Sequence, residues 1–347
     1  MGRPRHILVI RLSAMGDVAM MLPVLKAFTE KYPDVKLSLL TRRFFTPMFK
    51  DLPNVQVFEA EVKGRHQGLR GLKRLSSELL DLKIEAVADL HNVLRSNILK
   101  FFFKLKGIPV RQIDKGRKEK KALTRSNNKV FKQLKATQQR YAEVFDKLGY
   151  PVDISAVQVL QKQESTENLR AVTGEKAEKW LGIAPFAQHA SKAYPEDLMK
   201  EVLQELQKGQ NLKIFLFGGG KEETGKLAAW EKTFPKAVSV AGKLSFEEEL
   251  ALISNLDLML SMDSGNGHLA ANFGVPVISI WGLTHPYTGF APFRQPATNS
   301  LLPNLQKYPA IPTSIYGKDI PKGYEEVMRS IPPQKVVEKI KELLGRS

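Results

Sequence analysis

A carboxylate next to a glycine follows the first apolar run of the chain, in the segment Arg11-Leu-Ser-Ala-Met-Gly-Asp-Val18. Gly16 permits a tight turn from a strand into a helix, which places Asp17 at the start of that helix. A carboxylate in this position could take the proton of an incoming hydroxyl group as a general base. Capping of the helix by Asp17 explains the residue equally well, so both interpretations stay open. The segment lacks the G-x-G-x-x-G pattern of dinucleotide-binding proteins.

A second segment, Ser261-Met-Asp-Ser-Gly-Asn-Gly-His-Leu-Ala-Ala271, combines two glycines with small polar residues. We expect it to connect a strand to a helix, so that backbone N–H groups at the helix N-terminus can hold a pyrophosphate. Asp263 beside a phosphate site then requires a partner of its own, such as a ribose hydroxyl or a cation. The alternative is an ordinary strand–helix turn in which His268 is a satisfied polar residue.

Two further loops of the second half also follow expected strands. Gly218, Gly219 and Gly220 allow a ligand to approach the backbone closely, although glycine-rich turns are common. Lys192 lies in the loop 184–195, where its ammonium group could neutralise phosphates and stabilise a departing nucleoside diphosphate. Taken alone, Lys192 is explained more simply as a surface lysine ahead of a helix.

Polar residues follow an expected strand of the first half too, in the segment Asp89-Leu-His-Asn-Val-Leu-Arg-Ser96. His91, Asn92 and Arg95 could hold a sugar or a phosphate of an acceptor, while helix capping by Asn92 with Arg95 on the surface is an equal alternative. The sequence has no H-E-x-x-H, P-loop, G-x-S-x-G or paired-cysteine pattern. This argues against metalloproteases, nucleoside triphosphatases and typical serine hydrolases.

The elements that must position these residues alternate between strands and helices, twice over. Short apolar runs bounded by Gly, Pro, Asp or Asn predict strands, and apolar residues that recur on one face predict helices. The expected strands cover residues 7–12, 37–40, 55–58, 86–90, 182–185, 213–217, 258–261 and 277–281. The expected helices cover residues 18–31 (kinked or shortened by Pro23), 69–82, 195–208, 246–255, 267–273 and 333–344.

This alternation predicts an α/β protein with two Rossmann-like domains, each a parallel sheet flanked by helices, that face each other. At 347 residues the chain is long enough for two domains. We expect an N-terminal domain over residues 1–165, a C-terminal domain over residues 166–330, and a last helix within residues 331–347 that packs back on the N-terminal domain. The linker is expected within residues 162–176. Open sheets of this kind bind ligands at the carboxyl ends of their strands.

The net charge of +17 is concentrated in the first half of the chain. Residues 1–170 contain 33 Lys and Arg against 17 Asp and Glu, while the remainder contains 20 against 19. Residues 91–140, hereafter the basic segment, hold 15 basic and 2 acidic residues. Such a segment attracts the phosphates of lipids or nucleic acids, unless it is only a solvated surface.

Composition and hydropathy give an expectation for the compartment. The chain has no Cys, which excludes disulfides and thiolate nucleophiles and fits a reducing environment. The apolar run at residues 7–12 is too short for a signal peptide, and no window approaches the roughly 18 apolar residues that span a bilayer. We therefore expect a cytoplasmic protein that rests peripherally on a membrane surface.

The five segments, in this order and spacing, resemble the glycosyltransferase family that contains the ADP-heptose:lipopolysaccharide heptosyltransferases, glycosyltransferase family 9. The most specific part is Asp263-Ser-Gly-Asn-Gly-His-Leu-Ala-Ala271, followed by Gly274-Val-Pro276 and Trp281-Gly-Leu-Thr-His-Pro286. The resemblance runs from about residue 6 to about residue 345. It implies GT-B architecture: two Rossmann-like domains with parallel sheets facing across a cleft, acceptor in the N-terminal one and nucleotide-sugar donor in the C-terminal one. It also implies inverting transfer without an essential metal or other cofactor.

The resemblance further implies roles for individual residues. Asp17 matches the catalytic base, and Lys192 matches a lysine that contacts the donor phosphates. The expected donor-binding residues are Ser13, Gly16, Gly218, Gly219, Glu222, Asp263, Ser264, Gly265, Asn266, Gly267 and His268. The expected acceptor-binding residues are His91, Asn92, Arg95, Lys120 and Lys121. The chain departs from the family at Ala14, where a second hydroxyl residue is common, and at Ala193-Tyr194, where Arg-Trp is common.

These features predict an enzyme that moves a heptose from ADP-heptose to an anionic lipopolysaccharide core or lipid A-type acceptor. The basic segment would hold the enzyme on the inner face of the inner membrane, and no nucleic acid is expected as a partner. One alternative is an enzyme of the same architecture, a transferase or an epimerase, that uses another nucleotide sugar. The other alternative is a nucleic-acid-binding protein that uses the basic segment.

Overall fold

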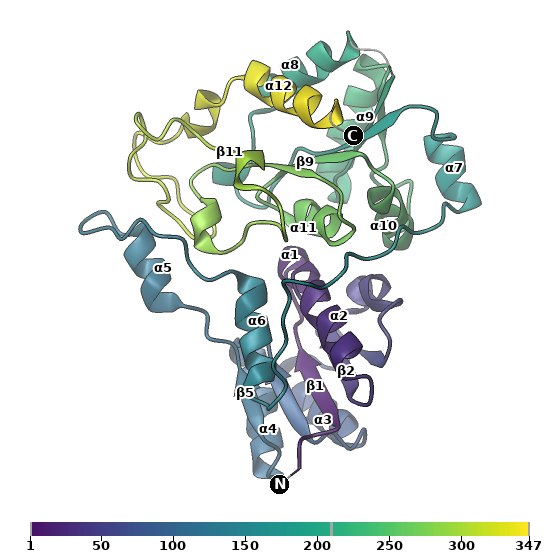
Figure 1. Cartoon of the computed structure of the whole chain (residues 1–347), viewed down its shortest axis with the longest axis vertical. Coiled ribbons are helices and arrows are strands. Elements are labelled where there is room, and N and C mark those ends of the chain that lie inside the picture. The colour runs from purple at the N-terminus through teal and green to yellow at the C-terminus, as the bar shows by residue number, and fades with distance from the viewer. Residues whose placement is uncertain (1, 209–210, 346–347) are drawn as a thin grey trace. The chain divides into compact units, whose positions relative to one another are not determined.

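The computed structural model describes residues 2–208 and 211–345, and the chain forms two compact units (Figure 1). The first unit contains the chain up to Lys115 and again Ala136–Gln158. The second contains Gly116–Lys135 and the chain from Val159 onward. The chain therefore enters the second unit, returns to the first and then leaves it again, so neither unit is one continuous segment. No helix of the described residues is both long and apolar enough to cross a bilayer.

The first unit is built on a sheet of parallel strands in the order β3-β2-β1-β4-β5. The strands are β1 His6–Ile10, β2 Lys36–Thr41, β3 Val55–Glu59, β4 Ala86–Asp89 and β5 Val110–Gln112. Ile7 of β1 pairs with Leu37 on one side and with Ala86 on the other. The chain runs outward from β1 to β3 and then returns to the opposite side of β1 at β4. The carboxyl ends of β1 and β4 are therefore the switch point at which such sheets bind ligands.

The helices of the first unit cover this sheet through apolar side chains. They are α1 Met15–Ala19, α2 Leu22–Lys31, α3 Gly68–Leu80, α4 Leu94–Leu105 and α6 Thr137–Asp146, with a 3₁₀ segment η1 at Arg43–Phe49. Leu75 of α3 and Phe103 of α4 pack in one cluster with Leu8 of β1. Elsewhere in the unit α2 and α6 pack together, with the rings of Phe28 and Phe145 4.8 Å apart.

The helix predicted over residues 18–31 is divided in two, as the proline in it suggested. Helix α1 ends at Ala19, and Pro23 lies in the first turn of α2. Proline has no backbone N–H to donate, but the first turn of a helix requires no such donor. The break places Asp17 in a helix of its own, directly after β1.

The second unit has a sheet of parallel strands in the order β11-β10-β9-β6-β7-β8. The strands are β6 Lys179–Ala184, β7 Leu212–Leu216, β8 Ala237–Ser239, β9 Leu258–Met262, β10 Val277–Ile280 and β11 Ser300–Leu301. Leu181 of β6 pairs with Ile214 on one side and Leu258 on the other. The switch point of this sheet therefore lies at the carboxyl ends of β6 and β9.

The helices of the second unit include α5 Arg117–Thr124, α7 Glu167–Thr173 and α9 Gly220–Thr233, for which the sequence predicted no helix. Also in this unit are α8 Glu196–Gln207, α10 Phe246–Ser254, α11 Gly265–Asn272 and α12 Pro333–Leu344. Helix α7 occupies the expected linker, residues 162–176. Helix α12 packs on α8 and β9, and Val336, Val337 and Ile340 belong to the core of this unit. This placement differs from the expectation that the last helix packs on the N-terminal domain.

Residues 116–135 also belong to the second unit, although we predicted an uninterrupted N-terminal domain over residues 1–165. The contacts that hold them there reach far along the chain. Leu134 donates its backbone N–H to the carbonyl of Tyr287 at 2.9 Å, and Lys129 donates to the carbonyls of Ala310 and Pro312. The ring of Phe131 lies 5.1 Å from that of His285. Such contacts leave no local pattern in the sequence.

Candidate active site

Asp17 lies at the switch point of the first unit, in the first turn of α1. Its Oδ2 atom is 2.5 Å from Nη2 of Arg11 and accepts from the backbone N–H of Ala14 at 3.4 Å. Tyr141 of α6 donates its hydroxyl to the backbone carbonyl of Asp17 at 3.2 Å. The capping contact to Ala14 is long, whereas the ion pair is short, so Arg11 determines where the carboxylate points. The Asp17 side chain is 28% exposed and that of Arg11 8%. A buried cation thus holds a carboxylate that a ligand can reach.

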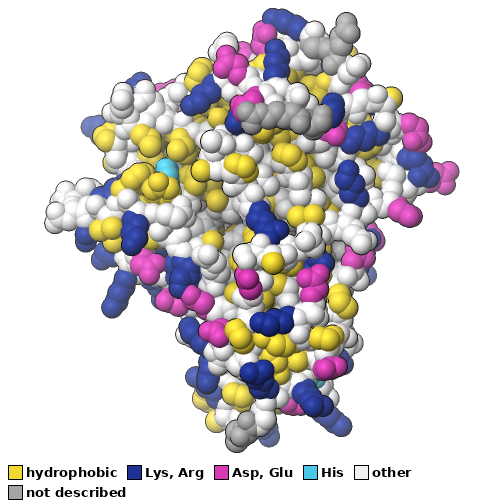
Figure 2. All heavy atoms as spheres, viewed as in Figure 1, with side chains coloured by type: hydrophobic (Ala, Val, Ile, Leu, Met, Phe, Trp, Pro, Cys, Tyr) yellow, Lys and Arg dark blue, Asp and Glu magenta, His cyan; other side chains and the backbone are white. Residues whose placement is uncertain are grey.

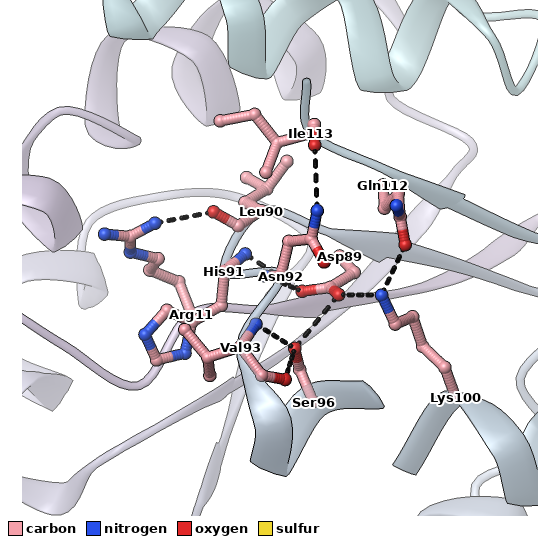
Figure 3. A network of polar contacts seen from close by, with 10 residues as sticks. All are labelled: Arg11, Asp89, Leu90, His91, Asn92, Val93, Ser96, Lys100, Gln112 and Ile113. Carbon is pink, nitrogen blue, oxygen red and sulfur yellow. Dashed lines mark hydrogen bonds and ion pairs between the residues drawn. The ribbon is translucent and has the colours of Figure 1, made fainter. Parts of the chain in front are cut away.

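Arg11 also joins the loop after β1 to the loop after β4 (Figure 3). Its Nη1 donates to the backbone carbonyl of Leu90 at 2.7 Å. The backbone N–H of Leu12 points at Nδ1 of His91 at 3.4 Å, next to this contact. Burial, and then the charge of Arg11, lower the pKa of His91 to about 4, so the ring is neutral at pH 7. A neutral ring with Nδ1 as the acceptor fits the N–H of Leu12.

A buried carboxylate organises the loop that carries His91 and Asn92 (Figure 3). Oδ1 of Asp89 accepts from the backbone N–H groups of His91 and Asn92 at 2.9 and 2.8 Å. Its Oδ2 accepts from Ser96 Oγ at 3.0 Å and lies 2.7 Å from Nζ of Lys100. Asp89 is 0% exposed, and a charge at such depth is tolerated only when it is paired and hydrogen-bonded, as it is here. The loop is therefore held rigidly in the first unit.

The five residues predicted to bind the acceptor fall into both units. His91 and Asn92 are in the loop after β4, and Arg95 is exposed on the first turn of α4. Lys120 and Lys121 are on α5, which belongs to the second unit. Figure 2 shows several Lys and Arg side chains over α5, and Nζ of Lys120 lies 4.4 Å from the ring centre of Phe290.

Lys192 and Asp263 meet at the switch point of the second unit. Nζ of Lys192 is 2.8 Å from Oδ2 of Asp263, and Thr284 donates its hydroxyl to the same oxygen at 2.8 Å. Their side chains are 17% and 7% exposed, and Thr284 is fully buried. We expected an acidic residue beside a phosphate site to need a partner, such as a cation. In the structure the partner of Asp263 is the ammonium group of Lys192. An ammonium group has three N–H donors, so Lys192 can hold an anion while it stays paired with Asp263.

The loop that carries Lys192 is fixed by its neighbours on both sides. Ser191 donates its hydroxyl to the carbonyl of Gly317 at 2.5 Å, and its own carbonyl accepts from Leu283 N–H at 3.2 Å. A Cβ atom at Gly282 would overlap the carbonyl oxygen of Ser191, so only glycine allows this approach. The position of Lys192 therefore depends on the segment that follows β10.

Helix α11 begins at Gly265, two residues before the predicted start at residue 267. Ser264 is its N-cap residue, with extended backbone angles, and Ser264, Gly265 and Asn266 are half-buried. The first N–H groups of an α-helix have no acceptor within the helix, so this end can receive an anion. Gly267 has a structural reason as well, because a Cβ atom there would overlap Oγ of Ser261. His268 is 6% exposed, inside the first turns of the helix.

The glycine-rich turn follows β7, the strand that pairs with β6 in the sheet. Gly218 fits against Leu227, and the N–H of Gly219 donates to Oε2 of Glu223 at 2.7 Å. Glu222 is 83% exposed on the first turn of α9 and lies 3.0 Å from Nζ of Lys226. The turn is thus open to a ligand at Gly219 and Glu222, the residues predicted to meet a nucleoside.

Arg11, Ser191 and Thr284 are among the residues of these two sites that had no predicted role. Arg11 stands directly after β1, six residues before Asp17, which is the signal that could have identified it. Thr284 is part of the Trp281–Pro286 signature, but its partner lies 21 residues earlier. Among the described residues, no group of three or more His, Cys, Asp or Glu side chains is arranged to hold a metal ion.

Comparison with known proteins assigns the chain to a family. The sequence profile of glycosyltransferase family 9 (heptosyltransferase) matches residues 72–316. The chain belongs to glycosyltransferase family 9. The matched range contains the loop after β4 and the Lys192–Asp263 pair, and it begins after Asp17. The chain is therefore a glycosyltransferase, as predicted.

The similarity to relatives and to solved structures extends over most of the chain. The lipopolysaccharide core heptosyltransferase OpsX of Haemophilus influenzae is 25% identical over 294 residues, which are 82% of this chain and 80% of that protein. The family 9 glycosyltransferase of Veillonella parvula superposes with a TM-score of 0.76 at 18% identity and covers 99% of this chain and 98% of its own. The Escherichia coli heptosyltransferase WaaC with ADP-2-deoxy-2-fluoro heptose gives a TM-score of 0.66 at 18% identity, with 97% and 99% covered. These likenesses confirm the predicted fold class, GT-B with two Rossmann-like domains.

Proposed function

We propose that this family 9 enzyme moves a heptose from ADP-heptose to an anionic lipopolysaccharide core or lipid A-type acceptor, with inversion at the anomeric carbon. The observation that carries the proposal is the Lys192–Asp263 ion pair at the switch point of the second unit, next to the first turn of α11. Its support from relatives is that OpsX is a lipopolysaccharide core heptosyltransferase and that WaaC was solved with an ADP-heptose analogue.

The donor diphosphate is assigned to the second unit. The N-terminus of α11 and Lys192 offer N–H donors and positive charge at one place, and Asp263 holds the lysine there. The nucleoside is assigned to the turn at Gly218, Gly219 and Glu222. As charge develops on the departing diphosphate, these groups stabilise it without having to move.

The catalytic base is assigned to Asp17. Both described contacts of its carboxylate use Oδ2, to Arg11 and to Ala14, and in the proposal Oδ1 takes the proton of the acceptor hydroxyl. The hydroxyl oxygen forms a bond to the anomeric carbon while the bond from that carbon to the diphosphate oxygen breaks. The electron pair of the broken bond stays on the nucleoside diphosphate. One displacement inverts the anomeric centre, and Ser13 and Gly16 are assigned to the sugar side of the donor.

The acceptor is assigned to polar and basic residues of both units. His91 and Asn92 follow β4, at the same switch point as Asp17, and Arg95 adds a charge beside them. Lys120 and Lys121 of α5 belong to the basic segment, which suits the phosphates and acidic sugars of such an acceptor. We place the reaction at the cytoplasmic face of the inner membrane, where the basic segment meets an anionic leaflet.

Calorimetric titration of nucleotides and nucleotide sugars tests the donor assignment. ADP-heptose should bind, and Lys192→Met should weaken it by about 10- to 100-fold, because charge-assisted hydrogen bonds to the diphosphate are lost. Lys243→Met, which removes an exposed lysine 2.8 Å from Glu231 in the same unit, is the matched control and should bind normally. Preference for another nucleotide sugar would support the alternative donor, and equal affinity of both lysine variants would reject the phosphate assignment.

A second measurement tests whether the transfer inverts the configuration of the anomeric carbon. The product formed from ADP-heptose and a heptose-deficient lipopolysaccharide should carry the sugar with the anomeric configuration opposite to that in the donor, as read from proton–carbon coupling in its NMR spectrum. Retained configuration would contradict the one-step displacement. Release of free sugar epimer without any acceptor would indicate the epimerase alternative.

A further inference from the structure

Helix α4 exposes an apolar stripe although its opposite face is already buried in the first unit. Leu94, Ile98, Phe101 and Leu105 follow one another at helical spacing, so they share one face. Leu94, Phe101 and Leu105 are 77%, 59% and 66% exposed, and Leu94 is the most exposed large hydrophobic side chain among the described residues. Leu99 and Phe103, on the opposite face, are fully buried. Core packing therefore does not explain the stripe.

The stripe continues into a hollow between α4 and the neighbouring helix α3. The hollow has a volume of about 430 Å³, and its lining is mostly apolar, including Leu69, Leu72, Leu94 and Ile98. Leu69 is 70% exposed at the start of α3. The two helices pack against each other within the first unit (Figure 1), so the hollow and the stripe form one continuous surface.

Positive charge surrounds this surface. Helix α4 contains no Asp or Glu, and Arg95 and Lys104 flank the stripe on its two sides. Lys106 follows the helix, and α3 adds exposed basic residues at Arg70, Lys73 and Arg74. The acid of these two helices, Glu78, lies 3.1 Å from the ring of His66 and 3.5 Å from Arg65, so its charge is compensated. An apolar stripe between cations suits an anionic bilayer surface, where the cations meet phosphates and the stripe enters the acyl boundary.

We infer that the stripe of α4 and the adjoining hollow dock the first unit on an anionic membrane leaflet. This inference deepens the proposed function and rests on it for its purpose, because an acceptor anchored in that leaflet would then lie near His91 and Asn92. These two residues are in the loop that leads into α4. The contact would be made by apolar insertion on α3 and α4 as well as by the charges of Arg95, Lys104 and Lys106 in the same unit.

Vesicle co-sedimentation of the full chain tests the inference without donor or acceptor. We expect binding to vesicles of phosphatidylcholine with phosphatidylglycerol, and weak binding to phosphatidylcholine alone. The double variant L94S/F101S should lose about tenfold or more in vesicle affinity, because two large apolar side chains no longer enter the lipid. Phe44→Ser is the matched control: Phe44 is 55% exposed on η1 of the same unit, outside the stripe, and its loss should change little.

Because the chain has no Cys, a single introduced thiol gives a second readout. A polarity-sensitive fluorophore on L105C should shift to the blue when anionic vesicles are added, and the same label on F44C should not. The inference is overturned if wild type does not bind anionic vesicles, if L94S/F101S binds as wild type does, or if both labels respond alike. It is also overturned if the double variant only changes self-association in sedimentation velocity, since the stripe would then be an interface between copies.

Failure of this inference can be told apart from failure of the proposed function. With an acceptor dispersed in detergent, L94S/F101S should transfer heptose at the wild-type rate, because the membrane is absent from that assay. A chain that binds vesicles but does not transfer heptose contradicts the function alone. A chain that transfers heptose but shows no stripe-dependent binding contradicts the docking surface alone.

Discussion

Replacement of Asp263 by Ala tests how strongly the Lys192–Asp263 ion pair stabilises the second unit. The substitution leaves the ammonium group of Lys192, only 17% exposed, without its anion. Breaking a buried ion pair costs about 3–5 kcal/mol, and the partial exposure of Lys192 argues for the lower end. The buried hydroxyl of Thr284 also loses its acceptor, which adds about 1 kcal/mol. We therefore expect Asp263→Ala to lower the free energy of unfolding by about 3–4 kcal/mol.

Tryptophan fluorescence can follow this change in one unit alone. All three tryptophans, Trp180, Trp230 and Trp281, lie in the second unit. Urea unfolding followed by their emission therefore reports the unit that contains the substitution, and a shift in the midpoint at constant slope measures the loss. The double variant K192M/D263A removes both charges and should be more stable than Asp263→Ala, which isolates the coupling between the two.

A matched control decides between a buried and a surface ion pair. Glu231 and Lys243 are 2.8 Å apart in the same unit, but their side chains are 29% and 42% exposed. Glu231→Ala should cost less than about 1 kcal/mol. The pair is not coupled as argued if Asp263→Ala costs no more than this control. It is also not coupled if the destabilisation of K192M/D263A equals the sum of the destabilisations of Lys192→Met and Asp263→Ala.

Three further predictions follow from single positions. Gly282→Ala should destabilise the second unit by about 1–3 kcal/mol, because the added methyl group would displace the carbonyl of Ser191. The same displacement should weaken ADP-heptose binding at least about tenfold. Unchanged affinity in calorimetry would count against this. Burial raises the pKa of Glu249 to about 7. Glu249 therefore ionises at a lower pH in the unfolded chain than in the folded one, and the free energy of unfolding falls as the pH rises from about 4.5 to 7. Glu249→Gln should abolish that loss, of up to about 3 kcal/mol, in urea unfolding at pH 5 and pH 8; an equal pH dependence in both proteins would reject it. Burial lowers the pKa of His91 to about 4, so the unfolded chain is protonated first and stability falls as pH drops from about 6.5 to 4. His91→Gln keeps an acceptor for the N–H of Leu12 and should lose less stability than wild type over that pH range, as followed by circular dichroism. An acid transition identical to that of wild type would contradict the assignment.

The two switch points could be predicted from the sequence because they combine local signals. Each strand before them is a short apolar run, and each is followed by glycine and polar residues that start a helix. Asp17 and Asp263 were therefore placed correctly after β1 and β9. The break in the first predicted helix also followed from one residue, Pro23, whose chemistry permits few positions.

Pairing between distant residues could not be predicted in the same way. Lys192 and Asp263 are 71 residues apart, and their contact depends on β6 and β9 being neighbours in the sheet. Arg11 reaches a carbonyl 79 residues away, at Leu90. Strand order decides these contacts, and the apolar pattern of a strand carries no information about which strand lies beside it.

The extents of the two units differ from the predicted domains for a related reason. Residues 116–135 are polar and basic, and this composition does not indicate on which domain they pack. Contacts from Leu134 to Tyr287 and from Lys129 to Ala310 draw them into the second unit. Strands β5, β8 and β11 have three, three and two residues, which is too short for an alternating pattern to show. Helix α12 was predicted with the right bounds, yet its partner α8 could not be inferred.

The most direct test of the central claim is the release of ADP from ADP-heptose in the presence and absence of a heptose-deficient lipopolysaccharide. We expect acceptor-dependent release by wild type and a rate about 10²- to 10⁴-fold lower for Asp17→Asn, with unchanged binding of ADP-heptose. Asp34→Asn, an exposed acid of the same unit, should react as wild type does. Wild-type turnover by Asp17→Asn would contradict the account, as would ADP release that does not depend on the acceptor.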